Sequence, residues 1–461
     1  MKEEKADNPI LAGISESKER QIVFDDNVSR LNTSSSEAKK QYSNLDLAKK
    51  RAGSIRHKAV NGLEKYLIEF EANIERNGAK VVWALDDEEA VKVILDILKK
   101  HQVNYLTKSK SLIADEIDLY SQLAENNVVC EEVNIGEYIL RLSGNSPRHY
   151  SSLLIEKSLS QINEVLLDKH VISSRGKVSD TYSAVIKNRK EALRTSTASI
   201  IGANFLIADT GSVCVSEDAG DAVINSVLPD VQIIIAGIDK MIPSIMNLDV
   251  LLPLYSTYST GERINTFNTI LSGPRAENET DGPRDMYVIL LDNGRSNVLA
   301  QKFQRRALSC IDCGACQNAC PVYRKIGGEG YQTTYCGPVG SVITPWMKGI
   351  EEYNSMSYLS TLCGLCTDAC PVMINLHDLL LYNRRDGIQM KNRTFSESLV
   401  MEGWHHILKS RKWMDWPKYK WKNLILKKLY LRRWVSSDHF PEIGSKNFKN
   451  LWEERREGKV K

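Results

Sequence analysis

Residues 310–321 read Cys-Ile-Asp-Cys-Gly-Ala-Cys-Gln-Asn-Ala-Cys-Pro, a dense run of cysteines in the C-terminal half of the chain. The spacing Cys-x2-Cys-x2-Cys-x3-Cys-Pro is the bacterial ferredoxin pattern for a 4Fe–4S cluster. Iron in a sulfide-bridged cubane prefers soft, charged sulfur ligands, which thiolates supply. The two-residue gaps let one tight loop wrap three corners of a cube, and the three-residue gap carries Cys320 onto the next turn. The run therefore predicts an iron–sulfur site.

A second copy of the run follows at residues 363–371, Cys-Gly-Leu-Cys-Thr-Asp-Ala-Cys-Pro, and it aligns without gaps to residues 313–321. Two such runs predict a module of two clusters, in which the fourth cysteine of each run ligates the other cluster. A single Cys-x2-Cys pair would also suit zinc, but two matched runs favour iron–sulfur clusters. The expected ligands are Cys310, Cys313, Cys316 and Cys370 for cluster one, and Cys320, Cys363 and Cys366 for cluster two.

The repeat lacks one thiolate, because Ser360 stands at the position that matches Cys310. Cys336 lies between the two runs and is one candidate for the fourth ligand of cluster two. The alternative is that Cys336 is a buried small residue beside a Gly-Pro turn. Cluster two then has a non-cysteine fourth ligand or is a 3Fe–4S cluster.

Composition bounds the class of protein. The 461 residues are 42% hydrophobic and 26% charged, which is ordinary for globular domains and excludes disorder throughout. No apolar run approaches the ~18 residues that cross a bilayer. Residues 1–10 are charged and lack the apolar core of a secretory signal. We therefore predict a cytoplasmic protein. In the reducing cytoplasm, clustered thiols hold metal rather than form disulfides.

Residues 60–300 alternate strand-like and helix-like segments, which predicts an α/β domain with a largely parallel sheet. The expected core strands are residues 81–84, 231–238 and 286–291, and a β-hairpin is expected over 205–215. The other predicted segments are a mobile, then helical arm that packs on the next domain (1–59), a two-cluster ferredoxin-like domain (301–385) and a basic, Trp-rich helical tail (386–461).

Two short motifs in the α/β region carry charged side chains. Asp209 lies in an Asp-Thr-Gly-Ser sequence, which is also an aspartic-protease signature, but no second copy supplies the required partner carboxylate. A hairpin turn is expected, with a substrate-facing carboxylate as the alternative. Arg295 follows a strand in Asp-Asn-Gly-Arg-Ser, where it could bind a carboxylate or phosphate of a ligand. The alternative is a turn with a solvated arginine. The sequence assigns no catalytic residue.

The segment from Trp404 to Trp434 contains five tryptophans and ten Lys or Arg residues, against the single acid Asp415. Basic residues interleaved with aromatics suit a membrane surface or a nucleic acid. No recognition module accompanies them, so nucleic-acid binding is not predicted. We expect a helical tail whose tryptophans cover the protein, or a partner contact.

Several motifs together resemble known families. They are Gly202-Ala203-Asn204-Phe205, Ala208-Asp209-Thr210-Gly211-Ser212, Gly273-Pro274-Arg275, Asp292-Asn293-Gly294-Arg295-Ser296 and, between the cysteine runs, Tyr335-Cys336-Gly337-Pro338-Val339-Gly340. The first four resemble the LUD domain, and over residues 60–400 the chain resembles the lactate utilization protein B family. The family usually has Glu at the position of Asp209 and often Ser at 336, which argues against Cys336 as a ligand.

The resemblance implies a sugar-phosphate isomerase/CoA-transferase-like α/β fold. It also implies a cytoplasmic iron–sulfur protein that acts with two partners, A-like and C-like, to oxidise L-lactate to pyruvate. Two functions are therefore open. The chain is an electron-transfer component of that complex, or a stand-alone oxidoreductase with a small-molecule site in the LUD domain and the clusters as electron outlet. No flavin or nicotinamide fingerprint is visible, which favours the first, because clusters carry one electron at a time and lactate releases two.

Overall fold

The chain is described from a computed structural model, which covers residues 17–144, 149–150, 154–390, 395–411, 413, 416, 418–430, 443–446 and 448–457. It forms two compact units that divide after Gly387. Residues 1–16, where the mobile lead was predicted, lie outside the described residues.

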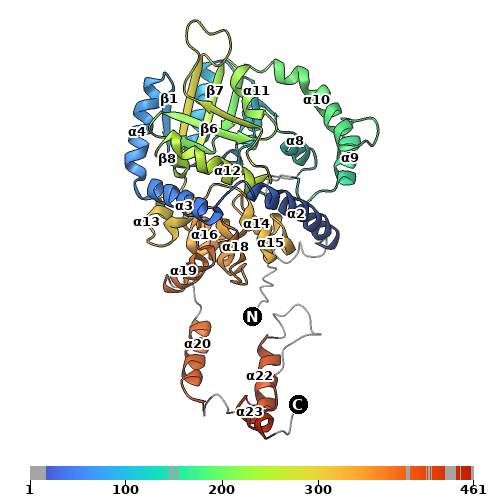
Figure 1. The fold of residues 1–461 in the computed structure, drawn as a ribbon, viewed down its shortest axis with the longest axis vertical. Helices are drawn as coiled ribbons and strands as arrows, with labels where there is room; N and C mark the ends of the chain where they lie inside the picture. Colours follow the sequence, from blue (N-terminus) through green and yellow to red (C-terminus); the bar gives the residue numbers. More distant parts are fainter. Residues whose placement is uncertain are drawn as a thin grey trace. The chain divides into compact units, whose positions relative to one another are not determined.

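A six-stranded, fully parallel sheet forms the centre of the first unit (Figure 1). Its strands are, in sheet order, β1 (Lys80–Ala84), β10 (Asp285–Leu291), β7 (Val231–Gly237), β4 (Ala198–Gly202), β2 (Tyr105–Lys108) and β3 (Val129–Glu132). The three core strands predicted from apolar runs are confirmed as β1, β7 and β10. All seven residues of β7 are buried, as expected for a strand covered on both faces.

The two faces of the sheet carry alternate side chains of each strand. Ile233 and Ile235 pack with α5 (Asp87–Lys100), α6 (Leu112–Glu116) and α7 (Leu119–Glu125). Ile234 and Ala236 face the opposite way, toward α4 (Leu63–Arg76), α11 (Asp221–Val227) and a second, four-stranded sheet. That sheet has the order β8 (Met241–Ile242), β5 (Phe205–Ile207), β6 (Ser212–Glu217) and β9 (Phe267–Leu271).

The predicted hairpin is confirmed, because β5 and β6 pair antiparallel. Gly211 at its turn has φ +60°, and a Cβ there would lie 2.3 Å from the backbone nitrogen of Ile74. Only glycine fits this close approach. Strands β8 and β9, which extend the hairpin into a sheet, were not predicted from the sequence.

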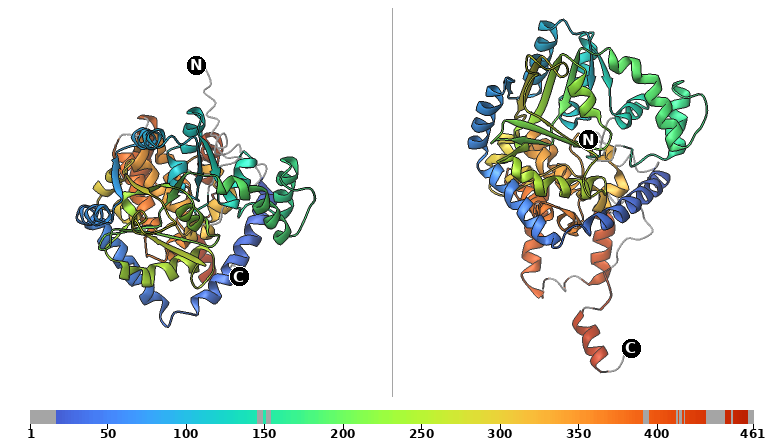
Figure 2. Two further views of the ribbon diagram at one scale, coloured as in Figure 1. Left: turned by 90° about the horizontal axis from the view of Figure 1, so that it is seen from above. Right: turned by 45° about the horizontal axis from the view of Figure 1, so that its top comes forward.

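Three helices project to one side of the sheet, as both views of Figure 2 show in green. They are α8 (Ile135–Leu142), α9 (Leu159–Asp168) and α10 (Val178–Arg194), and they enclose a small apolar cluster around Leu166 and Val185.

The cysteine region packs beneath the sheet, with α2 (Ser17–Lys39) and α3 (Leu45–Asn61) between them (Figure 1). One apolar core joins Leu251 of α12 (Leu248–Ser259) to Val342 of the cysteine region. The remaining elements of this unit are α13 (Arg295–Ala300), η3 (Gln304–Ser309), α14 (Ala315–Ala319), α15 (Pro321–Ile326), α16 (Gly337–Lys348), α17 (Ile350–Tyr353), α18 (Leu365–Ala369) and α19 (Leu376–Gln389), with the short 3-10 turns η1 (Ile238–Lys240), η2 (Ile245–Asn247), η4 (Glu329–Tyr331) and η5 (Asn354–Tyr358).

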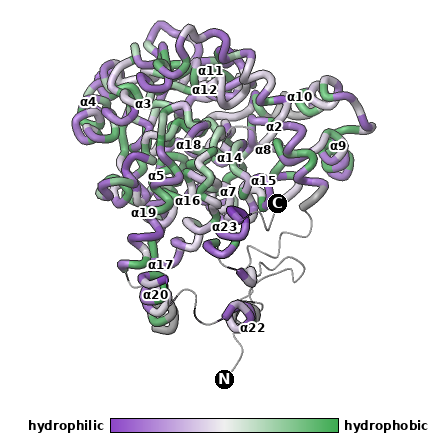
Figure 3. Tube along the Cα trace, turned by 60° about the horizontal axis from the view of Figure 1, so that its bottom comes forward, coloured by the Kyte–Doolittle hydropathy of each residue, from purple (hydrophilic) through white to green (hydrophobic). Residues whose placement is uncertain are grey.

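The second unit contains the helices α20 (Phe395–Leu408), α22 (Tyr419–Tyr430) and α23 (Phe448–Arg456), so the tail is helical as predicted. Helix α23 is mostly hydrophilic (Figure 3). The four described tryptophans of residues 404–434 are about half exposed or more: Trp404, Trp413, Trp416 and Trp421. Trp434 and Asp415 lie outside the described residues. None of the described helices has the length and apolar character of a membrane span.

Candidate metal centre

The two cysteine runs fold into the same backbone path. Each run has two residues with positive φ, followed by a five-residue helix, α14 or α18. Those residues are Asp312 (φ 55°) and Gly314 (φ 74°) in the first run, and Leu362 (φ 56°) and Gly364 (φ 84°) in the second. The left-handed turns coil the chain tightly, as a loop around one face of a cube requires. The sequence repeat is therefore also a structural repeat.

The cysteines of the two runs pack together, because Cys313 and Cys316 share one apolar core with Cys366 and Cys370. The predicted crossed ligation divides the seven thiols into a first group that includes Cys370 and a second group that includes Cys320. Burial, and then the neighbouring Cys310, Cys313, Cys366 and Cys370, raise the pKa of the Cys316 thiol well above its ordinary value. Burial raises the pKa of Cys366 to about 11, and Cys320 and Cys363 add to the increase. Cys370 thus lies beside the first run, and Cys320 lies beside the second.

This arrangement fits iron–sulfur clusters. Cys310 is half-buried, Cys363 is exposed and the other five thiols are buried. Several thiolates buried together repel one another, so they need compensating positive charge, which cluster iron supplies. Among the described residues, no three His, Cys, Asp or Glu side chains could hold a single metal ion. A cubane differs, because each thiolate binds a separate iron.

Ser360 occupies the place of a cluster ligand. Its hydroxyl accepts a hydrogen bond from the backbone N–H of Leu362 at 3.1 Å. In the first run, the Cys310 sulfur accepts the equivalent bond from Asp312 at 3.4 Å. The side chains at 310 and 360 therefore start from matching positions in the two loops.

Cys336 is fully buried at the start of α16 and packs with Cys320, Tyr323 and Tyr331. Its sulfur accepts a hydrogen bond from the Gln317 amide at 3.2 Å. Cys336 therefore has the surroundings of a packed, hydrogen-bonded small residue, although its side chain lies close to the second group of thiols.

We predict that cluster two is the more sensitive to oxygen, because an iron without a thiolate ligand is lost more easily. Ser360→Cys should therefore increase the iron retained after exposure to air. Cys336→Ser should change the amount of retained iron little. Iron content and electron paramagnetic resonance, recorded on anaerobic samples before and after air, measure both effects. Loss of cluster two in Cys336→Ser alone would identify Cys336 as the fourth ligand.

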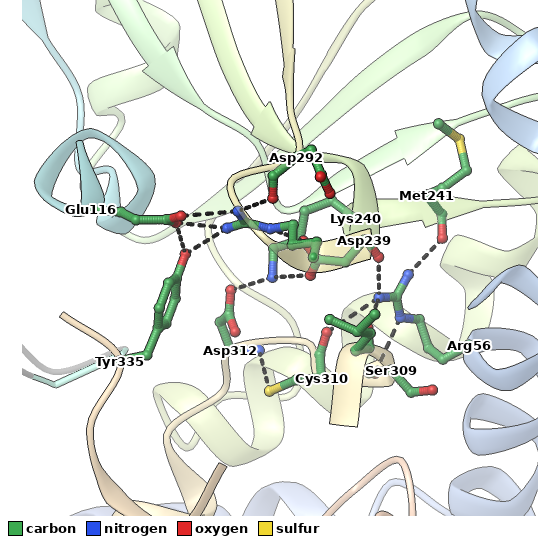
Figure 4. Close-up of polar contacts among 12 residues, drawn as sticks. Arg56, Glu116, Asp239, Lys240, Met241, Asp292, Ser309, Cys310, Asp312 and Tyr335 are labelled. Atoms are coloured by element: carbon green, nitrogen blue, oxygen red, sulfur yellow. Dashed lines mark hydrogen bonds and ion pairs between the residues drawn. The ribbon is translucent and has the colours of Figure 1, made fainter. Parts of the chain in front are cut away.

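A buried network of charges lies between the sheet and the first cysteine loop (Figure 4). Arg295, at the start of α13, forms a paired contact with Glu116, with nitrogen–oxygen distances of 3.0 and 2.7 Å. Its Nε also donates to Asp239 at 2.7 Å, and its Nη2 donates to the Tyr335 hydroxyl at 3.0 Å. Arg295 is only 3% exposed. Both earlier interpretations of Arg295 are therefore wrong: it binds carboxylates of the protein itself and is not solvated.

The network continues to the loop that contains Cys310. Lys240 contacts Asp239 at 3.1 Å and Asp312 at 2.6 Å. Arg56 of α3 is fully buried and donates to the carbonyl oxygens of Asp239, Met241, Leu308, Ser309 and Cys310. Arg56 and Lys240 therefore fix the backbone that presents the first cysteine, and they place positive charge beside it. No pattern in the sequence indicates either role.

Asp209 lies at the protein surface. Its exposed carboxylate accepts a hydrogen bond from the backbone N–H of Ile245 at 3.0 Å. The residue belongs to the hairpin turn, as the first of the two interpretations had it.

Two family models agree with this architecture. The family model described as LUD domain matches residues 67–291, and the model described as 4Fe-4S dicluster domain matches residues 306–374. "Lactate utilization protein B" of Bacillus thuringiensis (strain Al Hakam) and of Bacillus cereus (strain AH187) are each 35% identical over 374 residues, 81% of this chain and 79% of theirs. A crystal structure of a DUF162 family protein from Deinococcus radiodurans covers 50% of this chain and 98% of its own, with 14% identity and a TM-score of 0.28.

The parallel sheet and the paired cysteine runs thus define an iron–sulfur protein with a LUD domain and a 4Fe–4S dicluster domain. Its cofactors are iron–sulfur clusters. At this identity and coverage, the chain belongs to the lactate utilization protein B family.

Proposed function

We propose that this chain is the iron–sulfur electron-transfer component of a complex that oxidises L-lactate to pyruvate, together with A-like and C-like partner proteins. The main support is the close packing of the two cysteine runs, in which Cys313 and Cys316 share one apolar core with Cys366 and Cys370. Two clusters in contact provide a relay of one-electron carriers, and such relays connect a substrate site to an acceptor. The family to which the chain belongs supports the link to lactate.

We assign cluster one to Cys310, Cys313, Cys316 and Cys370, and cluster two to Cys320, Cys363 and Cys366. The clusters supply one-electron transfer when bound. The protein residues position them: Arg56 holds the carbonyl groups that precede Cys310, and Lys240 holds Asp312 two residues later. Oxidation of lactate releases two electrons and two protons, so a two-electron step is required in the complex before the electrons enter the clusters singly.

The alternative is a stand-alone oxidoreductase, in which the α/β region contains the whole active site. A cavity at the carboxyl end of the sheet, beside the first cysteine loop, is the observation that favours it. Lactate oxidation by the purified chain with an artificial electron acceptor, measured with and without the partners, separates the two functions.

We predict turnover with the partners and none without them. In the complete complex, electron paramagnetic resonance should show reduced clusters after addition of lactate under anaerobic conditions. Turnover by the chain alone would contradict the proposal. Clusters that stay oxidised while pyruvate forms would contradict it too.

A further inference from the structure

A cavity with a volume of about 720 Å³ lies at the carboxyl ends of β2, β4 and β7. Ser109, Gly202 and Gly237 stand at these three ends and line it. Strands β2 and β4 are neighbours, but the chain leaves them in opposite directions: from β2 to β3, and from β4 toward β7. Ligands of open α/β sheets bind at such a switch point, and this volume is typical of ligand sites.

The cavity also borders the loop of cluster one. Asp312, two residues after Cys310, forms part of its wall, as do Tyr150 and Tyr335. The rings of the two tyrosines stack with centroids 6.2 Å apart. Tyr150 shares one apolar core with Cys313 and Cys316. Burial, and then the nearby Cys336 and Cys310, raise the pKa of its hydroxyl well above the ordinary value. A molecule in the cavity therefore lies next to the first cluster.

Three hydroxyl groups in the cavity wall are buried and have no hydrogen-bond partner within the described part of the chain: Ser109, Tyr150 and Ser259. The three residues are at most 3% exposed. A buried hydroxyl without a partner costs about 1–3 kcal/mol, so such groups in a cavity point to a ligand that bonds them. They suit a molecule with several oxygen atoms.

Four cationic side chains line the cavity, Arg30, Lys110, Lys157 and Lys240, together with the acids Glu217, Asp218, Asp221 and Asp312. The cationic side chains suit a carboxylate among such molecules. Lys110 is half-buried in the wall, where desolvation lowers its pKa and the nearby carboxylates of Glu137, Asp218, Asp221 and Glu217 oppose that shift. Burial, then the nearby Asp221, raise the pKa of Glu217 to about 8, so this carboxyl is mostly protonated at neutral pH and can donate a hydrogen bond. Asp312 is already paired with Lys240, and Asp218 is exposed.

We infer that this cavity binds a small 2-hydroxy or 2-oxo carboxylate beside cluster one, with Lys110 and Ser109 at the carboxylate and Tyr150 at the second oxygen. This inference rests on the proposed function and adds to it the place of the substrate. The volume exceeds that of a three-carbon acid, so acids with longer side chains fit as well.

Isothermal titration calorimetry on the anaerobic, cluster-loaded full chain tests the site with L-lactate, pyruvate and propionate. Propionate lacks the oxygen on carbon 2 and should bind about tenfold more weakly or worse. Lys110→Met should weaken lactate binding about tenfold or more, because it removes a charged hydrogen-bond donor. Lys58→Met is the matched control: Lys58 is exposed on α3, outside the cavity, and its loss should change affinity by less than about twofold.

Tyr150→Phe separates binding from folding. It removes only a buried hydroxyl without a partner, so the free protein should be as stable as the wild type or more so. Lactate affinity should nevertheless fall about fivefold, the loss of one neutral hydrogen bond. A lower thermal midpoint together with unchanged affinity would show a structural role and contradict the inference.

The outcomes also separate this inference from the proposed function. If the complex oxidises lactate but the wild-type chain binds neither lactate nor pyruvate, the inference is wrong and the function stands. Binding that Lys110→Met, Ser109→Ala and Tyr150→Phe all leave unchanged places the site elsewhere and also overturns the inference. Binding that these variants weaken, without turnover by the complex, supports the site and contradicts the function.

Discussion

Cys370→Ser should remove the same cluster as Cys310→Ser, although residue 370 belongs to the second cysteine run. The thiol of Cys370 lies with Cys313 and Cys316, and it contributes to the raised pKa of each, after the larger effect of burial. A cubane that loses one of its thiolates is destabilised, and cluster one is one of the two expected clusters, so the iron content should fall by roughly half. The electron paramagnetic resonance of the two reduced variants should show the same remaining cluster.

Two other cysteines serve as controls. Cys366→Ser should affect the second cluster and give a different remaining signal, because Cys366 lies with Cys320 and Cys363. Cys214→Ser should leave both clusters intact, since Cys214 is a buried thiol in β6, outside both groups. If Cys370→Ser instead retains the signal that Cys310→Ser abolishes, the crossed ligation is wrong.

The sequence predicted best what depends on neighbouring residues. The cysteine spacing is local, and the two loops repeat because the same residue types occupy the same left-handed positions, such as Gly314 and Gly364. The core strands were also predictable: a strand buried on both faces, such as β7, is a continuous apolar run in the sequence.

The sequence could not predict contacts between distant elements. The partners of Arg295 are Glu116 and Asp239, which lie 179 and 56 positions away in the chain. No local pattern marks such a contact, so an arginine after a strand could equally be a ligand-binding residue or a solvated turn. Arg56 was missed for the same reason, because its acceptors are backbone carbonyl groups of two other segments.

The cavity could not be predicted from the sequence either. Its wall combines the ends of three strands with Tyr150 and Asp312, which come together only when the cysteine region packs beneath the sheet. The sequence did predict that ligands gather at the carboxyl ends of the strands, but it pointed to the end of β10 and Arg295. The cavity instead lies at β2, β4 and β7, where the chain changes direction in the sheet.

Arg295→Met should lower the free energy of unfolding by about 3–5 kcal/mol, because it leaves buried carboxylates without their cation. The Glu116 side chain is fully buried and that of Asp239 is 8% exposed, so water cannot replace the guanidinium. Despite burial, Lys240, Arg295 and Arg56 hold the pKa of Asp239 well below its usual range. Asp239 thus contributes stability above the pKa of an unfolded aspartate, and this contribution is lost as the pH falls through its folded pKa.

Urea unfolding of anaerobic samples, followed by circular dichroism, measures the effect. Arg284→Met is the matched control, because Arg284 and Asp230 form an exposed pair at 3.2 Å that should contribute about 0–1 kcal/mol. The double variant Arg295→Met, Glu116→Gln should regain part of the lost free energy of unfolding, since it removes one of the carboxylates that are left without a cation. The difference in the free energy of unfolding between wild type and Arg295→Met should also become smaller toward acid pH, where protons neutralise the carboxylates that are left without a cation. A loss no larger than that of Arg284→Met, at every pH, would mean that the contacts of Arg295 with Glu116 and Asp239 do not stabilise the fold.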